Sequence, residues 1–167
     1  MQLKPLTKGL MLALPLMVLA ACSSTDDNAA GSTDDSAITG TATPMLTPEE
    51  ERMQRYAEMR KEHIIYFDFD RSDVRGEFAE LLAAHADYLV KNPGVSVRVE
   101  GHADERGTPE YNIALGERRA KAVTNYLMSL GVLASQISTV SYGEEMPLVA
   151  GHNDEAWSKN RRAVLVY

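Results

Sequence analysis

Cysteine is nearly absent from this 167-residue sequence, which has only Cys22. A lone thiol cannot form an intramolecular disulfide, so the chain is not a small disulfide-stapled scaffold. Basic residues are also in deficit, because 17 lysines and arginines stand against 24 aspartates and glutamates and give a formal net charge of −7. This balance argues against nucleic acid as a partner, since proteins that bind it neutralise phosphates with clustered Lys and Arg.

Signatures of common enzymes are missing as well. The four histidines lie in different segments, and no two of them have the spacing of a metal-binding helix. No Gly-x-Ser-x-Gly elbow of a serine hydrolase occurs. The run His-Ala-Asp-Glu at 102–105 leaves an acid–base or metal site open as an alternative, but we expect neither catalysis, nor a cofactor, nor a metal.

The longest apolar run lies near the N-terminus and has the layout of a secretory signal. Two lysines precede roughly a dozen apolar residues at 9–20, fewer than the roughly 20 that a membrane span needs. The run ends in Leu-Ala-Ala-Cys22, which resembles a bacterial lipobox. The resemblance implies cleavage after residue 21 and a covalent lipid on Cys22, and Ser23 after the cysteine implies sorting to the outer membrane. The alternative is an ordinary signal followed by a cysteine without a role.

A polar segment and a helix follow the lipobox. Residues 22–46 are rich in Ser, Thr, Asp, Gly and Ala, with four aspartates and no basic residue. Such a composition buries too little apolar surface to offset its ordering entropy, so it predicts a disordered tether with a reach of roughly 25–30 Å. Thr47, Pro48 and Glu50 form the signature of a capping box, which predicts an N-terminal helix at 47–61 with a thin apolar stripe.

Residues 62–167 have the pattern of one compact domain. Runs rich in β-branched and aromatic residues, or with strict alternation, predict strands at 63–69, 95–100, 137–143 and 161–167. Helical spacing of apolar residues predicts helices at 77–92 and 109–131, and a short one around Trp157. The order β-α-β-α-β-β predicts an α/β (α+β) domain whose helices cover one face of a four-stranded mixed sheet.

The loop "HADERGT", at the carboxyl end of the strand 95–100, is the candidate site. Ligands of open α/β sheets gather at such strand ends. Asn112, Leu115 and Arg119 are spaced by three and four, so they share one face of the next helix. We expect Asp104 to accept an ammonium group and Arg119 to donate two hydrogen bonds to a carboxylate, both from the surface. The alternative is that Asp104 caps its own turn and Arg119 is one of many surface arginines.

The run "GHADERGTPEYNIALGERRAKAV" decides between these interpretations. Together with "IYFDFD" before it and "VSYGEEMPLVAGHNDEAWSKNRRAVLVY" after it, it resembles the OmpA-like peptidoglycan-binding domain, and most closely the lipoprotein branch of that family in Gram-negative bacteria. The resemblance covers about residues 60–167, and the lipobox and tether agree with it. The broad family usually has Thr at the position of Ala103, whereas the lipoprotein branch often has Ala.

The resemblance implies a function and a set of site residues. It implies non-covalent binding of the stem peptide of peptidoglycan through its meso-diaminopimelate, by a lipid-anchored outer-membrane protein whose domain faces the periplasm. The family's motif positions fall on Asp104, Asn112, Leu115 and Arg119. Further stem-peptide contacts fall on Arg106 and Thr108, and an opposite wall falls on Asp68, Phe69 and Asp70.

Protein partners are the other function that the resemblance implies. The periplasmic propeller protein of the Tol system would bind this domain in competition with the cell wall, in envelope integrity and cell division, and other OmpA-like or lipoprotein envelope proteins are further candidates. The sequence does not locate that surface, because the aromatic run at 66–69 is also explained by core packing of a strand. We expect Arg161 and Arg162 to close a strand end or to pair with acids such as Glu144 or Glu145.

Changing Cys22 to Ser tests the anchor. Because serine lacks the thiol that accepts the lipid, we expect no palmitate labelling, and either release of the chain into the periplasm or an uncut precursor. Labelling with radioactive palmitate and fractionation of membranes measure this. A Cys22→Ser chain that is still labelled and still sediments with the outer membrane would show that the lipobox interpretation is wrong.

Overall fold

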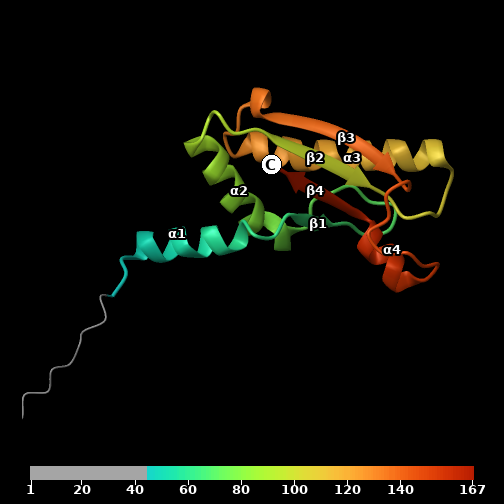
Figure 1. Ribbon diagram of the computed structural model, residues 1–167, viewed down its shortest axis with the longest axis horizontal. Coiled ribbons are helices and arrows are strands. Elements are labelled where there is room, and N and C mark those ends of the chain that lie inside the picture. The colour runs from blue at the N-terminus through green and yellow to red at the C-terminus, as the bar shows by residue number, and fades with distance from the viewer. Residues whose placement is uncertain (1–44) are drawn as a thin grey trace, which may run out of the picture. The chain divides into compact units, whose positions relative to one another are not determined.

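The computed structural model describes residues 45–167 (Figure 1). The predicted signal at 1–21, the lipidated Cys22 and all but the last two residues of the tether at 22–46 lie outside the described residues. None of the helices from residue 45 onward has both the length and the apolar character needed to cross a membrane.

Four strands form one mixed sheet in the order β1-β4-β2-β3. They are β1 (Ile64–Tyr66), β2 (Val97–His102), β3 (Ile137–Gly143) and β4 (Arg162–Val166). Strand β2 runs parallel to β3 and antiparallel to β4, and β4 runs antiparallel to β1. The parallel pair needs a crossover connection, which the long helix α3 (Pro109–Ser129) supplies. The predicted mixed sheet is confirmed.

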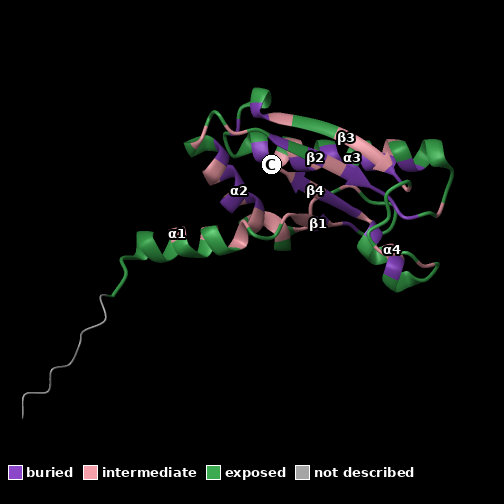
Figure 2. Cartoon of the chain, in the orientation of Figure 1, coloured by how far each residue is buried: buried purple, intermediate pink, exposed green. Residues whose placement is uncertain are grey.

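The core lies between one face of this sheet and two helices, α2 (Ala79–Lys91) and α3. Figure 2 shows the buried residues gathered on β2, β4 and the helices behind them. The alternation predicted for β2 is observed, since Val97 and Val99 are buried and Arg98 is exposed. The short helix predicted around Trp157 is α4 (Asp154–Asn160), and two 3₁₀ turns complete the domain at Gly76–Phe78 and Ala134–Gln136.

Helix α1 (Pro48–Met59) begins with the predicted capping box and ends two residues earlier than predicted. The Thr47 hydroxyl accepts a hydrogen bond from the Glu50 amide, and the Glu50 carboxylate accepts one from the Thr47 amide. None of the residues of α1 is buried (Figure 2). It meets α2 through polar contacts, such as the Arg55–Glu80 ion pair of 3.0 Å. The thin apolar stripe in its sequence therefore corresponds to a loosely packed helix.

Strands β1 and β2 differ most from the bounds that the sequence indicated. Strand β1 covers only three residues, because the chain turns at residues 68–70, where Asp70 has a φ of 55°. Aspartate tolerates this left-handed conformation better than most residues. Strand β2 continues to His102, with a register shift between Gly101 and His102. These two strand ends place the loop after β1 beside the loop after β2.

Helix α3 approaches β2 so closely that two glycines are needed. A Cβ atom at Gly101 would lie 1.9 Å from the Gly116 carbonyl oxygen, and one at Gly116 would lie 2.3 Å from the Ser141 hydroxyl oxygen. Any side chain at either position would push the helix off the sheet. The contact fixes the depth at which the side chains of α3 enter the domain.

A buried histidine joins the last residue of the chain to α2. The Nε2 atom of His85 lies 2.8 Å from the Glu62 carbonyl oxygen, and its Nδ1 atom lies 2.7 Å from the Tyr167 hydroxyl. Because a carbonyl can only accept, Nε2 carries the proton and Nδ1 accepts from Tyr167. Burial lowers the pKa of His85 to about 4, and the hydrogen bond to the Glu62 backbone opposes this shift only in part.

This histidine makes the fold sensitive to acid. Between the ordinary pKa of about 6.5 and the folded value of about 4, the unfolded chain binds a proton that the folded chain does not. The free energy of unfolding should therefore fall as the pH falls through this window, by about 3 kcal/mol from His85. We expect His85→Gln to flatten the dependence, measured by urea unfolding at each pH. The control His152→Gln changes an exposed histidine, and an equal flattening in that variant would contradict the assignment.

Candidate peptidoglycan-binding site

A cavity of about 250 Å³ lies where the loops after β1 and β2 meet the first turns of α3. Six of the nine predicted peptidoglycan-site residues line it: Phe69, Asp70, Asp104, Arg106, Leu115 and Arg119. Three further residues complete its wall: Gly107, Tyr111 and Arg161. A depression thus lies at the carboxyl end of β2, where the site was predicted, and its wall comes from three segments far apart in the sequence, at 69–70, 104–119 and 161.

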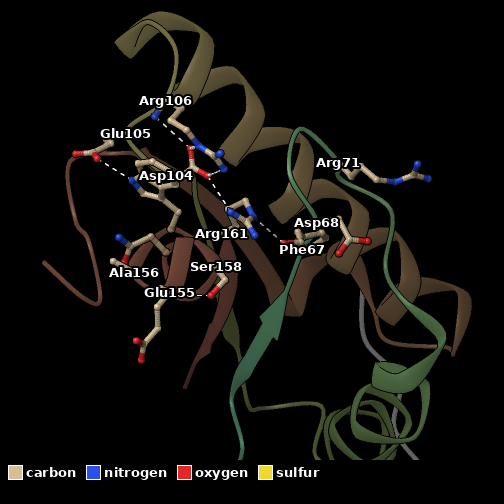
Figure 3. Close-up of polar contacts among 12 residues, drawn as sticks. Phe67, Asp68, Arg71, Asp104, Glu105, Arg106, Glu155, Ala156, Ser158 and Arg161 are labelled. Atoms are coloured by element: carbon tan, nitrogen blue, oxygen red, sulfur yellow. Dashed lines mark hydrogen bonds and ion pairs between the residues drawn. The ribbon is translucent and has the colours of Figure 1, made fainter. Parts of the chain in front are cut away.

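Asp104 is the acidic centre of the cavity and is only 4% exposed. Its Oδ2 atom accepts hydrogen bonds from Arg106 Nη2 at 2.7 Å and from Arg161 Nη1 at 3.1 Å. Figure 3 shows its carboxylate between these two guanidinium groups. Burial acts to raise the pKa of Asp104, but the hydrogen bonds from Arg106 and Arg161 outweigh it and lower the pKa. Asp104 is therefore a carboxylate at neutral pH, and it is not the surface group that the sequence indicated.

Arg119 is fully buried, which corrects the expectation of a surface guanidinium. It donates to three main-chain carbonyl oxygens: His102 at 2.7 Å, Arg71 at 2.9 Å and Asp68 at 3.2 Å. Desolvation lowers its pKa to about 10, with the charge of Asp104 opposing this, so it remains a cation at neutral pH. Three of its five N–H groups bind backbone, so Arg119 first of all joins the two loops that wall the cavity.

Three of the predicted site residues do not line the cavity. Asn112 is fully buried and donates to the Glu144 carboxylate. Thr108 is the N-cap of α3, where its hydroxyl accepts from the Tyr111 amide at 3.2 Å. Asp68 lines a neighbouring depression, and its Oδ1 atom lies 3.5 Å from Arg75 Nη1. The helix face shared by Asn112, Leu115 and Arg119 points into the domain, and only Leu115 and Arg119 reach the cavity.

Arg161 is the main site residue that sequence reasoning missed. It pairs with Asp104 and donates from Nε to the Phe67 carbonyl oxygen at 3.1 Å (Figure 3), not to Glu144 or Glu145. Arg162 donates to the carbonyl oxygens of Asn160 and Met146. No local pattern could have found the Arg161 contact, because 57 residues separate it from Asp104.

Aromatic residues surround Arg106, another arginine of the cavity wall. The Arg106 guanidinium lies 4.1 Å from the Phe69 ring centre and 4.3 Å from that of Trp157. The Trp157 indole is held by Glu105, which accepts its N–H at 2.7 Å and also pairs with His152. On the other side of the cavity, the Tyr111 hydroxyl donates to Asp70. The cavity therefore combines two carboxylates, three guanidinium groups and an apolar rim.

His102, the centre of the enzymatic alternative, does not line this cavity. It is buried and stacks on Tyr142 at a ring-centre distance of 5.5 Å. Burial is the first cause that lowers its pKa to about 4, and the charge of Arg162 adds to it. Within residues 45–167, no three His, Cys, Asp or Glu side chains are grouped as metal ligands.

Comparison with known proteins gives the family. The family model described as "OmpA family" matches residues 66–161. The chain belongs to the OmpA family. It is 49% identical to the peptidoglycan-associated lipoprotein of Haemophilus influenzae over 96% of this chain and 97% of that protein, and 50% identical to that of Pasteurella multocida over 99% and 100%.

A solved structure agrees with these relatives. The crystal structure of the peptidoglycan-associated lipoprotein from Burkholderia pseudomallei has a TM-score of 0.64 and 46% identity, over 64% of this chain and 91% of that one. The resemblance to the lipoprotein branch of the OmpA-like family is confirmed. These proteins are named for an association with peptidoglycan and not for a reaction, which agrees with the expectation that the chain is not an enzyme.

Replacing Arg119 by Ala tests the structural role of its guanidinium. Because one buried and two part-buried carbonyl oxygens lose their donor and a cavity remains, we expect the free energy of unfolding to fall by about 3–5 kcal/mol, measured in urea. The neighbouring Arg118→Ala is the control, since substitutions of surface residues usually change stability by about 0.5 kcal/mol or less. A loss below 1 kcal/mol for Arg119→Ala would contradict the bridging role.

Proposed function

We propose that this OmpA-family protein binds the meso-diaminopimelate of the peptidoglycan stem peptide in the cavity around Asp104. The observation that carries the proposal is a buried carboxylate beside three guanidinium groups in an open cavity. A diaminopimelate end presents both an ammonium and a carboxylate, and each has a partner of opposite charge there. The names of the relatives support peptidoglycan as the ligand class.

Each wall of the cavity has a role in this proposal. Asp104 attracts the ammonium, while Arg106 and Arg161 are the guanidinium groups exposed enough to reach a carboxylate, with 32% and 14% of their side chains exposed. Arg119 adds positive charge at the wall of the cavity. Its two remaining η N–H groups are available for the hydrogen bonds to a carboxylate that the sequence predicted for this residue. Leu115 packs against the methylene chain of the ligand.

The place of this function in the cell follows from the N-terminal motif. A lipid on Cys22 would hold the protein in the outer membrane, and the tether at 22–46 would let the domain reach the cell wall from the periplasmic side. Non-covalent binding there links the outer membrane to peptidoglycan, with a role in envelope integrity and cell division.

A protein partner at the same place is the second candidate function. Phe69 and Tyr111 are 57% and 43% exposed at the mouth of the cavity, and exposed aromatic residues are enriched at protein interfaces. The Tol-system propeller protein that the family resemblance implies would therefore compete with peptidoglycan for one surface.

Replacing Asp104 by Asn tests the ligand. Asparagine keeps the shape but loses the charge that attracts the ammonium, so we expect sacculus binding to weaken about 10- to 100-fold, the equivalent of 1.5–3 kcal/mol. Co-sedimentation with purified sacculi measures this, and free meso-diaminopimelate should displace the wild-type chain where lysine does not. The control Asp73→Asn removes another carboxylate that pairs with an arginine two residues away. Equal binding by Asp104→Asn and wild type would rule out this cavity as the site.

A further inference from the structure

The carboxylate of Asp104 has no vacant acceptor position in the folded chain. Its Oδ1 atom accepts from the Arg106 amide at 3.1 Å and from Arg106 Nε at 3.3 Å. Its Oδ2 atom accepts from Arg106 Nη2 and Arg161 Nη1. A carboxylate has about four acceptor sites, so these four hydrogen bonds saturate it. A ligand ammonium can reach Asp104 only if one of the protein's own donors leaves.

Arg106 is the donor that can leave. Arg161 is also fixed to the Phe67 carbonyl oxygen and is only 14% exposed, whereas the Arg106 guanidinium has Asp104 as its one hydrogen-bonding partner among the described residues. The rings of Phe69 and Trp157 enclose the Arg106 guanidinium at 4.1 and 4.3 Å. Cation–π attraction does not need one fixed hydrogen-bond geometry, so the two rings can hold the Arg106 guanidinium after its ion pair with Asp104 opens.

Charge balance then separates two classes of ligand. A plain amine that displaces Arg106 gains Asp104 but breaks the one ion pair that the guanidinium makes among the described residues. The nearby Asp70 and Glu105 are already bonded to Tyr111, Trp157 and His152, and Asp154 acts on Arg106 by its charge without a hydrogen bond. A zwitterionic end brings its own carboxylate for the guanidinium, so that two ion pairs replace one. Unpaired charges in a half-buried site are costly, which penalises the amine and not the zwitterion.

We propose that the Asp104–Arg106 ion pair opens to admit the zwitterionic end of the ligand, with the ammonium on Asp104 and the carboxylate on Arg106. Arg106 is thereby the residue that sets the preference for a zwitterion over a plain amine. This inference rests on the proposed function of the cavity and adds a specificity residue to it.

Replacing Arg106 by Ala tests the inference, with Arg106→Gln as a second variant. The probes are two synthetic stem tripeptides that end in meso-diaminopimelate or in lysine, titrated by calorimetry into the detergent-solubilised full chain. We expect the wild type to prefer the diaminopimelate peptide. Both variants should bind it more weakly and the lysine peptide more tightly, so that the ratio of the two dissociation constants falls about tenfold or more.

The matched control is Arg98→Ala. Arg98 also pairs with a carboxylate two residues away, Glu100 at 2.9 Å, but it lies outside the cavity, so the ratio should stay as in the wild type. A preference retained by both Arg106 variants overturns the inference and leaves the proposed function standing. Equal weakening of both peptides overturns it too, because Arg106 would then be a general contact. Failure of the wild type to bind either peptide overturns the proposed function and this inference together.

Trp157 gives a second readout, since it is the only tryptophan of the chain and stacks on Arg106. We expect its fluorescence to change when the wild type is saturated with the diaminopimelate peptide, and to change less in Arg106→Ala. An emission unchanged in the wild type at saturation would show that Arg106 stays on Asp104, contrary to the inference.

Discussion

The buried guanidinium of Arg119 is the interaction on which the rest of this binding surface depends. It takes a positive charge out of water, which is expensive, and offsets that cost with three main-chain carbonyl oxygens and the nearby charge of Asp104. Two of those carbonyls belong to the loop after β1 and the third to the end of β2. Loops tied in this way are held at a fixed separation, so the cavity between them exists before any ligand arrives.

The position of Arg119 is set by packing. Gly101 and Gly116 let the backbones of β2 and α3 touch, and this contact decides how deeply α3 sinks against the sheet. A shallower helix would leave the guanidinium short of its three carbonyls. The position of the Arg119 charge in the cavity therefore depends on the backbone contact between β2 and α3.

Charged side chains that line the cavity are paired with one another. Asp104 with Arg106 and Arg161 neutralises much of the local charge, and the aromatic rings of Phe69 and Trp157 flank the Arg106 guanidinium. The proposed exchange of partners at Asp104 needs no large rearrangement of the backbone.

The sequence alone predicts the order of strands and helices along the chain, the capping box at Thr47 and the polar loop around Asp104, because periodicity, capping and turn chemistry are local properties of the chain. It also indicated the lipid anchor at Cys22, which lies outside the described residues. Tertiary packing, in contrast, buries Arg119, keeps Asn112 out of the cavity lining, and brings Arg161 to Asp104 and Trp157 to Arg106. These contacts join residues that are 17 to 57 positions apart in the sequence. The packing of α3 against the strand ends brings such residues together, and a local sequence pattern does not predict that packing.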